Sequence, residues 1–185
     1  MGRPSTPSSA DTESQASDAP EPQRFQPAAA GRLFDEFEPG QIFGSAARTV
    51  TEADIVSFAG LSGDFNPLHT DEEYARATPF RGRIAHGLLV QSIASGLANQ
   101  TKVFEGTIAA LQEMLIRFRA PVFPGDTVHM ELTVREKDPK PNARRGWVRF
   151  DAAVKNQRDE VVIEGEWLTL MLRKRPPSQA AREAR

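Results

Sequence analysis

The chain has 185 residues, of which 39% are hydrophobic and 26% are charged, and its formal net charge is −2. These values are typical of one globular domain, and the nearly balanced charge gives no reason to expect nucleic-acid binding, which depends on neutralising phosphates. The chain has no cysteine, which excludes disulfides, thiolate metal sites and cysteine nucleophiles.

The two ends of the chain differ in composition from its middle. Residues 1–30 are rich in Pro, Ser, Ala and acidic residues, with too few large apolar side chains to offset the entropy of ordering the chain. Two prolines and the polar stretch "SQAAREAR" close the other end. We therefore expect disordered tails at 1–30 and 176–185 and one domain over 31–175.

Two targeting signals are missing from the sequence. The N-terminus lacks the apolar core of a secretory signal, and no apolar run approaches the roughly 20 residues that a membrane span needs. Together with the absence of cysteine, this predicts a cytoplasmic protein with no membrane partner.

Residues 51–99 carry helical signals. Thr51 is the expected N-cap of a helix over "TEADIVSFAG", and Thr70 with Glu73 forms an expected capping box before "DEEYARA". The stretch 84–99 leaves little polar surface, which predicts a long helix buried on nearly all sides.

The second half of the chain carries strand signals. Four segments are predicted as strands, at 107–119, 127–135, 147–155 and 161–172. In the second, apolar and polar residues alternate, as in a sheet with one covered face. "PGD" and "KDPKPN", at 124–126 and 137–142, supply turns. The pattern predicts an α+β fold in which one long helix is held against an antiparallel sheet.

The stretch "LSGDFNPLH", residues 61–69, holds the first candidate site. Its Gly, Asp, Asn and Pro residues are all turn formers, and a plain turn is one interpretation. Phe65 and Leu68 are interleaved with them and favour a loop packed into the body of the protein, where Asp64 and His69 would need partners. A carboxylate beside a neutral imidazole can hold one water molecule and move its proton, which is general acid/base chemistry.

The stretch "IAHGLL", residues 84–89, is the second candidate. It places His86 and Gly87 at the start of the long helix, where unpaired backbone N–H groups attract negative charge. Gly87 would allow a ligand oxygen to approach the backbone closely, as in an oxyanion hole. A tight start to a packed helix is the equally weighted alternative.

The stretch "FAGLSGDFNPLHTDEEYARATPFRGRIAHGLLVQSIASGL", together with "FRAPVFPGDTV", resembles the MaoC-like dehydratase family, or R-specific enoyl-CoA hydratases (hydratase 2). The resemblance covers about residues 40–135. It implies the hot-dog fold, a long central helix wrapped by an antiparallel sheet. It also implies a hydro-lyase that reversibly adds water to a trans-2-enoyl thioester, giving an (R)-3-hydroxyacyl thioester, with an acyl-CoA or acyl-carrier-protein substrate.

The resemblance also implies roles for individual residues. Asp64 and His69 would be the catalytic pair, and Asn66 would support them by hydrogen bonding. The Gly87 amide would bind the thioester oxygen as it gains enolate character. Ser95 matches a position that lines the active site, although a small residue at a close helix–sheet contact is an equal alternative.

Cofactors and anion contacts are the remaining site expectations. The three histidines show no zinc spacing, and no phosphate loop or dinucleotide fingerprint is present, so we expect no metal and no cofactor. Candidates to meet the carrier's phosphates are Arg81, Arg83, Arg117, Arg119, Arg144 and Arg145.

Two rival functions remain open. A thioesterase, or a dehydratase with a helix-borne glutamate, needs a carboxylate near the central helix, and residues 84–103 contain none. A non-catalytic thioester-binding or structural hot-dog subunit is the second rival. The presence of Asp64, His69 and Gly87 argues against it.

Single hot-dog units commonly pair through sheet edges, so we expect a homodimer.

Overall fold

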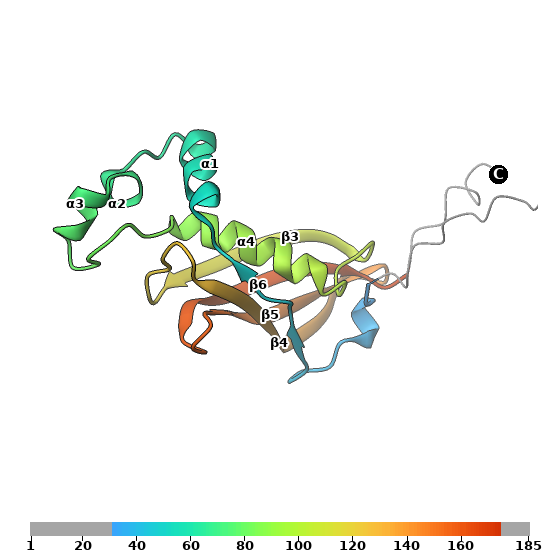
Figure 1. Cartoon of the computed structure of the whole chain (residues 1–185). Coiled ribbons are helices and arrows are strands. Elements are labelled where there is room, and N and C mark those ends of the chain that lie inside the picture. The colour runs from blue at the N-terminus through green and yellow to red at the C-terminus, as the bar shows by residue number, and fades with distance from the viewer. Residues whose placement is uncertain (1–30, 175–185) are drawn as a thin grey trace, which may run out of the picture.

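The computed structural model describes residues 31–174, and for residues 139–142 it describes the backbone alone. The expected tails, 1–30 and 176–185, lie outside the described residues. The described chain forms two layers, a six-stranded antiparallel sheet and the helix α4 (Gly87–Gln100), which lies along one face of the sheet (Figure 1). This confirms the expected α+β architecture of the hot-dog fold.

The sheet has the order β1-β4-β5-β6-β3, and β2 also pairs with β4. Its strands are β1 (Ile42–Gly44), β2 (Arg48–Thr49), β3 (Ile108–Phe118), β4 (Thr127–Asn142), β5 (Arg145–Lys155) and β6 (Val161–Leu172). The predicted bounds of β6 are confirmed, and those of β3 differ by one residue at each end. The strands β1 and β2 and the 3-10 helix η1 (Phe34–Glu36) were not predicted, because two or three residues are too few to show a hydrophobic period.

Strand β4 continues through the segment that was expected to be a turn. Within this segment, residues 137, 138, 141 and 142 pair with β5, and the hairpin turns at Ala143 and Arg144, since Asn142 pairs with Arg145. The pairing is irregular between Asp138 and Pro141, and such an irregularity is where a strand accommodates proline. The turn prediction was therefore wrong, because the ladder with β5 continues past residues that favour turns in isolation.

Three α-helices lie between β2 and α4: α1 (Glu52–Ser62), α2 (Pro67–Thr70) and α3 (Glu72–Arg76). Thr51 caps α1 as predicted, because its hydroxyl accepts the N–H of Asp54 at 3.2 Å. The cap of α3 is Asp71 and not Thr70, since the Asp71 carboxylate accepts the N–H of Tyr74 at 3.0 Å. Thr70 is instead the last residue of α2.

Helix α4 begins at Gly87, three residues later than predicted. Residues 83–86 before it are not helical, and the N–H of Ala85 donates to the carbonyl of Val122 at 2.7 Å. One face of α4 packs on the sheet and forms the core. Its buried apolar residues are Leu89, Val90, Ile93, Ala94, Leu97 and Ala98, which belong to one cluster with Met130, Leu132, Val148 and Phe150.

The opposite face of α4 is exposed in the single chain. It carries Leu88, which is 60% exposed, followed by the exposed residues Ser92, Ser95, Gly96 and Asn99. The expectation of burial on nearly all sides is therefore wrong for one chain. The sheet of one chain covers only one side of the helix, and α2 and α3 extend beyond the end of the sheet (Figure 1).

Candidate active site

A cavity of about 620 Å³ lies where the start of α4 meets the α1–α3 segment and the end of β3. This volume is within the range of small-molecule sites. Its wall is mainly apolar and includes the rings of Phe58, Phe80 and Phe118. The polar side chains on its wall are Ser62, Asp64, His69, His86 and Arg119.

The turn after α1 brings the predicted pair together. Helix α1 ends at Ser62 and is capped by Gly63, whose φ of +77° is a left-handed conformation that favours glycine. Asp64 follows, and the N–H of Asn66 donates to its carboxylate at 3.2 Å. The Asn66 side chain accepts the N–H of Leu68 at 3.0 Å and caps α2, which carries His69. The turn-forming residues thus build the site.

This loop is more exposed than the sequence suggested. Phe65 is 63% exposed, and Asp64 is also exposed. The expectation that the loop packs into the body of the protein is wrong for the single chain. The reason is that α2 and α3 extend past the sheet, so little of the chain covers this segment (Figure 1).

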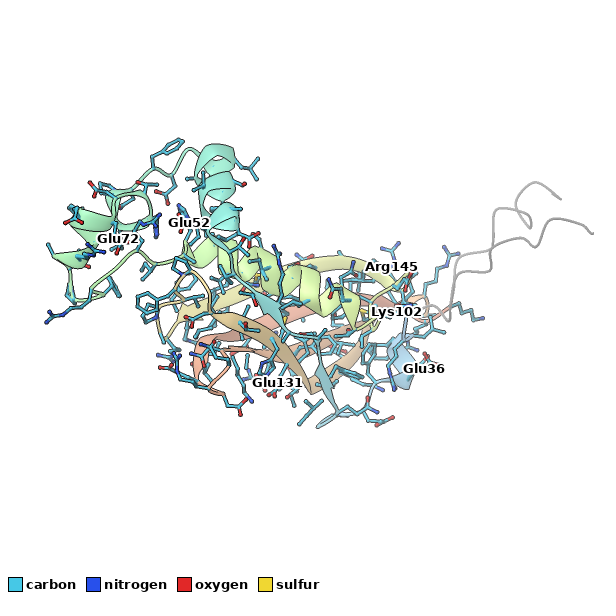
Figure 2. All side chains as sticks on the ribbon, in the orientation of Figure 1. Glu36, Glu52, Glu72, Lys102, Glu131 and Arg145 are labelled. Atoms are coloured by element: carbon cyan, nitrogen blue, oxygen red, sulfur yellow. The ribbon has the colours of Figure 1, made fainter. Side chains whose placement is uncertain are left out.

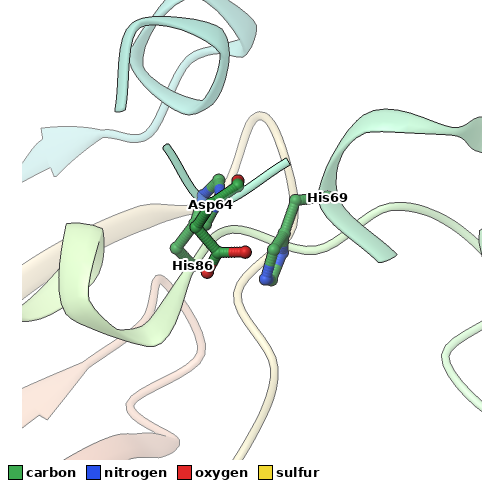
Figure 3. A group of neighbouring side chains, drawn as sticks. All are labelled: Asp64, His69 and His86. Carbon is green, nitrogen blue, oxygen red and sulfur yellow. The ribbon is translucent and has the colours of Figure 1, made fainter. Parts of the chain in front are cut away.

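His69 lines the cavity, and one of its ring nitrogens is hydrogen-bonded to the backbone. Its Nδ1 lies 2.8 Å from the carbonyl oxygen of Ile84. Because a carbonyl only accepts, Nδ1 carries the proton and Nε2 of the neutral ring is an acceptor. Figure 3 shows the Asp64 carboxylate directed toward the His69 ring. Two proton acceptors therefore face the same space.

His86 is a third member of the group, and its contact with the other two was not predicted. Its ring stacks on that of His69 with centroids 3.8 Å apart, and its Nε2 lies 2.9 Å from the carbonyl oxygen of Asp64. His86 is 17 residues beyond His69 in sequence, a spacing that indicates no contact. The one available signal was its position at the start of α4, beside Gly87.

The three side chains form the candidate metal group of the described residues. Ligand atoms of Asp64, His69 and His86 lie within 4.8 Å of one another. However, Nδ1 of His69 and Nε2 of His86 already donate to carbonyls, and Nδ1 of His86 is buried. Asp64 and Nε2 of His69 remain, fewer than the three protein ligands of a catalytic zinc ion. The arrangement is better suited to hold a water molecule.

Gly87 is the first residue of α4 and borders the cavity. The first N–H groups of a helix have no acceptor within it, and they lie at its positive end. A side chain at Gly87 would meet Phe118, because a Cβ atom would lie 2.5 Å from Cε1 of that ring. Both interpretations of this glycine therefore stay open: it packs tightly against Phe118, and it lines the cavity at the helix start.

Two other predicted site residues have different surroundings. The Asn66 side chain caps α2, so the contact of Asn66 with Asp64 comes from its backbone N–H and not from its side chain. Ser95 lies on the exposed face of α4, and it does not line the cavity in the single chain. Sequence spacing placed Ser95 on the correct helix but could not tell which face it occupies.

Two of the arginines expected to meet phosphates are paired with carboxylates. Arg83 donates to Glu52 and, through Nε, to Glu72 at 3.0 Å, which holds the pKa of Glu72 below its usual value and raises the pKa of Arg83. Figure 2 shows Glu52 and Glu72 at the same end of the molecule, so Arg83 ties α1 to α3. Arg119 pairs similarly with Glu164. The other four candidates are exposed, namely Arg81, Arg117, Arg144 and Arg145.

Comparison with known proteins gives the family. Residues 36–156 match the family model described as MaoC like domain. The chain belongs to the MaoC-like family. It is 39% identical over 133 residues to an "(R)-specific enoyl-CoA hydratase" of Rhodospirillum rubrum, covering 72% of this chain and 87% of that protein. It is 34% identical over 141 residues to a "3-hydroxybutyryl-CoA dehydratase" of Methylorubrum extorquens, covering 76% and 85%.

A solved structure of the MaoC-like family agrees with this assignment. The crystal structure of a MaoC-like dehydratase from Rhodospirillum rubrum superposes with a TM-score of 0.69 at 31% identity, covering 80% of this chain and 100% of that one.

Among the helices of residues 31–174, none has both the length and the apolar character required to cross a membrane.

Proposed function

We propose that this MaoC-like protein is an (R)-specific enoyl-CoA hydratase, a hydro-lyase that reversibly adds water to a trans-2-enoyl thioester. The observation that carries the proposal is that the Asp64 carboxylate and the acceptor nitrogen of His69 border one cavity beside the first residue of α4. The relatives named above, a hydratase and a dehydratase, support this reaction and its (R) stereochemistry.

In the proposed reaction, Asp64 and Nε2 of His69 each accept a hydrogen bond from one water molecule. The water oxygen forms a bond to C3 of the substrate, and the water gives one proton to the pair. The electrons of the C2=C3 double bond move toward the thioester oxygen, forming an enolate. The pair then returns a proton to C2, so the net change is the addition of one water molecule.

The start of α4 would stabilise the enolate. Negative charge develops on the thioester oxygen, and Gly87 lines the cavity as the first residue of α4, at the positive end of the helix. A donor aimed at the developing charge lowers the barrier because it binds the transition state more strongly than the substrate. This supports Gly87 as the oxyanion donor.

The substrate carrier is proposed to be CoA, because the names of both relatives given above specify a CoA thioester as the substrate. An acyl carrier protein presents the same thioester on a phosphorylated arm. Turnover of the same acyl group on the two carriers would distinguish them, and higher kcat/KM with CoA is expected.

A homodimer is proposed from two surfaces that one chain leaves uncovered. Strand β3 is an outer strand of the sheet, and its apolar residues Leu111 and Leu115 are exposed. Leu88 on α4 is exposed as well. An open edge strand with apolar side chains can pair with a second copy, which removes the edge.

The proposed activity is tested by the loss of the conjugated absorbance of a short trans-2-enoyl-CoA and by chiral analysis of the alcohol. We expect the (R)-alcohol, and we expect Asp64→Asn and His69→Ala each to lower kcat by about 10²- to 10⁴-fold, the usual contribution of a general acid or base. His129→Gln is the matched control, since His129 lies on β4 and does not line the cavity. No turnover of short, medium or branched enoyl-CoAs would contradict the proposal.

A further inference from the structure

His86 is buried between two aromatic rings. It is 2% exposed, its ring stacks on His69 at 3.8 Å with an interplanar angle of 30°, and the ring of Phe58 lies 5.1 Å away. Its backbone is also restrained, because it is the N-cap of α4 and the neighbouring Ala85 is hydrogen-bonded to Val122. The His86 ring therefore has little freedom to move.

The two nitrogens of His86 have unequal surroundings. Nε2 lies 2.9 Å from the carbonyl oxygen of Asp64 and carries the proton that it donates there. Nδ1 is buried and has no hydrogen-bond partner within the described residues. A buried acceptor without a partner costs free energy, so packing alone would favour an apolar ring at this position. The contact with Asp64 requires the histidine.

We propose that His86 is a positioning residue for the Asp64–His69 pair. Its N–H holds the backbone of Asp64, and its ring fixes the plane of His69, so one rigid side chain sets the distance between two groups on a turn and on α2. The turn is exposed, and two of the hydrogen bonds at Asp64, from its N–H to Ser62 and from the Asn66 N–H to its carboxylate, stay within the turn, so the contact with His86 ties the turn to the start of α4. This inference rests on the proposed function.

The neutral ring of His86 also suits the reaction electrostatically. When the proton that the pair takes from water lies on His69, that ring is a cation, and the face of a neutral aromatic ring attracts a cation. His86 is thus expected to support the transition state through its ring and to position Asp64 through its N–H.

Two variants separate these contributions. His86→Gln keeps an N–H donor near the position of Nε2 but removes the stacked ring, whereas His86→Phe keeps the ring but removes the donor. We expect each to lower kcat by about 10- to 100-fold, the usual effect of losing a residue that orients a catalytic group, with KM nearly unchanged. His129→Gln, on β4 outside the cavity, is the control and should retain full activity.

A double-mutant cycle with His69→Ala tests whether His86 acts through His69. The loss caused by His86→Gln should largely disappear in the His69→Ala background, because the group that it positions is absent. An equal loss in both backgrounds, or a rise in KM as large as the fall in kcat, would overturn the proposal.

A spectroscopic readout does not depend on turnover. Nitrogen-15 NMR of the wild-type imidazoles should show the proton of His86 on Nε2 and that of His69 on Nδ1, with peaks assigned from the single variants. A proton on Nδ1 of His86 would refute the arrangement. If the wild type hydrates no enoyl thioester, the proposed function fails, and the NMR result still decides whether His86 has the inferred contacts. Because this NMR measurement is made on the wild type, it also tests the inferred contacts if a His86 variant does not fold.

Discussion

Replacing Gly87 by alanine tests how closely Phe118 covers the start of α4. The added Cβ would lie 2.5 Å from Cε1 of Phe118 and 2.9 Å from its Cδ1 and Cζ atoms. Carbon atoms in ordinary contact are about 3.5–4.0 Å apart, so the ring must move by about 1 Å. Phe118 is 55% exposed and can move. The displaced ring would change the cavity beside the proposed oxyanion amide.

The effect on stability is expected to be small. Overpacking costs about 1–3 kcal/mol, and the exposed ring favours the lower end of this range. Alanine in place of glycine in a helix gains roughly 0.5–1 kcal/mol. The free energy of unfolding of Gly87→Ala should therefore stay within about 1 kcal/mol of the wild-type value. A misplacement of about 1 Å near reacting groups can lower activity by about 10²-fold, so activity is expected to fall far more than stability.

The assay combines urea unfolding with the rate of enoyl-CoA hydration. Gly60→Ala in α1 is the matched control, because a Cβ added at Gly60 would meet no atom within 4 Å outside its own helical turn, and this variant should keep full activity with a gain of roughly 0.5–1 kcal/mol. In a Phe118→Ala background, Gly87→Ala should cause little further loss of activity. The reasoning is refuted if Gly87→Ala lowers activity equally in both backgrounds, or leaves activity unchanged.

Two further predictions concern assembly and pH. Leu115→Lys places a charge on the exposed outer strand β3 and should shift the protein from a dimer to a monomer in sedimentation equilibrium, whereas a monomeric wild type would contradict the homodimer. The pKa of Asp54 is lowered from 3.8 by hydrogen bonds from Thr51 and by Arg48. A lowered pKa adds stability above pH 3.8 that is lost as pH falls through the folded-state pKa. The stability difference between wild type and Asp54→Asn should therefore shrink in acid urea titrations, and a difference independent of pH would refute this.

Much of the fold could be predicted because local patterns reflect local physics. The alternation along β4 follows from one covered sheet face, and the hydroxyl of Thr51 caps α1 through a contact three residues away. The wrong turn at 137–142 has the opposite cause, since pairing with β5 overrides the turn preference of those residues. The exposed face of α4 was also not predicted. Hydropathy shows how apolar a helix is, but not how many of its sides the rest of one chain can cover.

The sequence by itself determined the turn that brings Asp64 near His69 and the placement of Gly87 at a helix start, because both depend on residues close together in the chain. Only the tertiary structure decided that His86 stacks on His69 and that Phe118 covers Gly87. These contacts join the α1–α3 segment, α4 and the end of β3, and their geometry depends on how those elements pack. The spacing of residues in the sequence does not indicate how these elements pack. The contact of His86 with the Asp64–His69 pair and the shape of the cavity are therefore seen only in the folded chain.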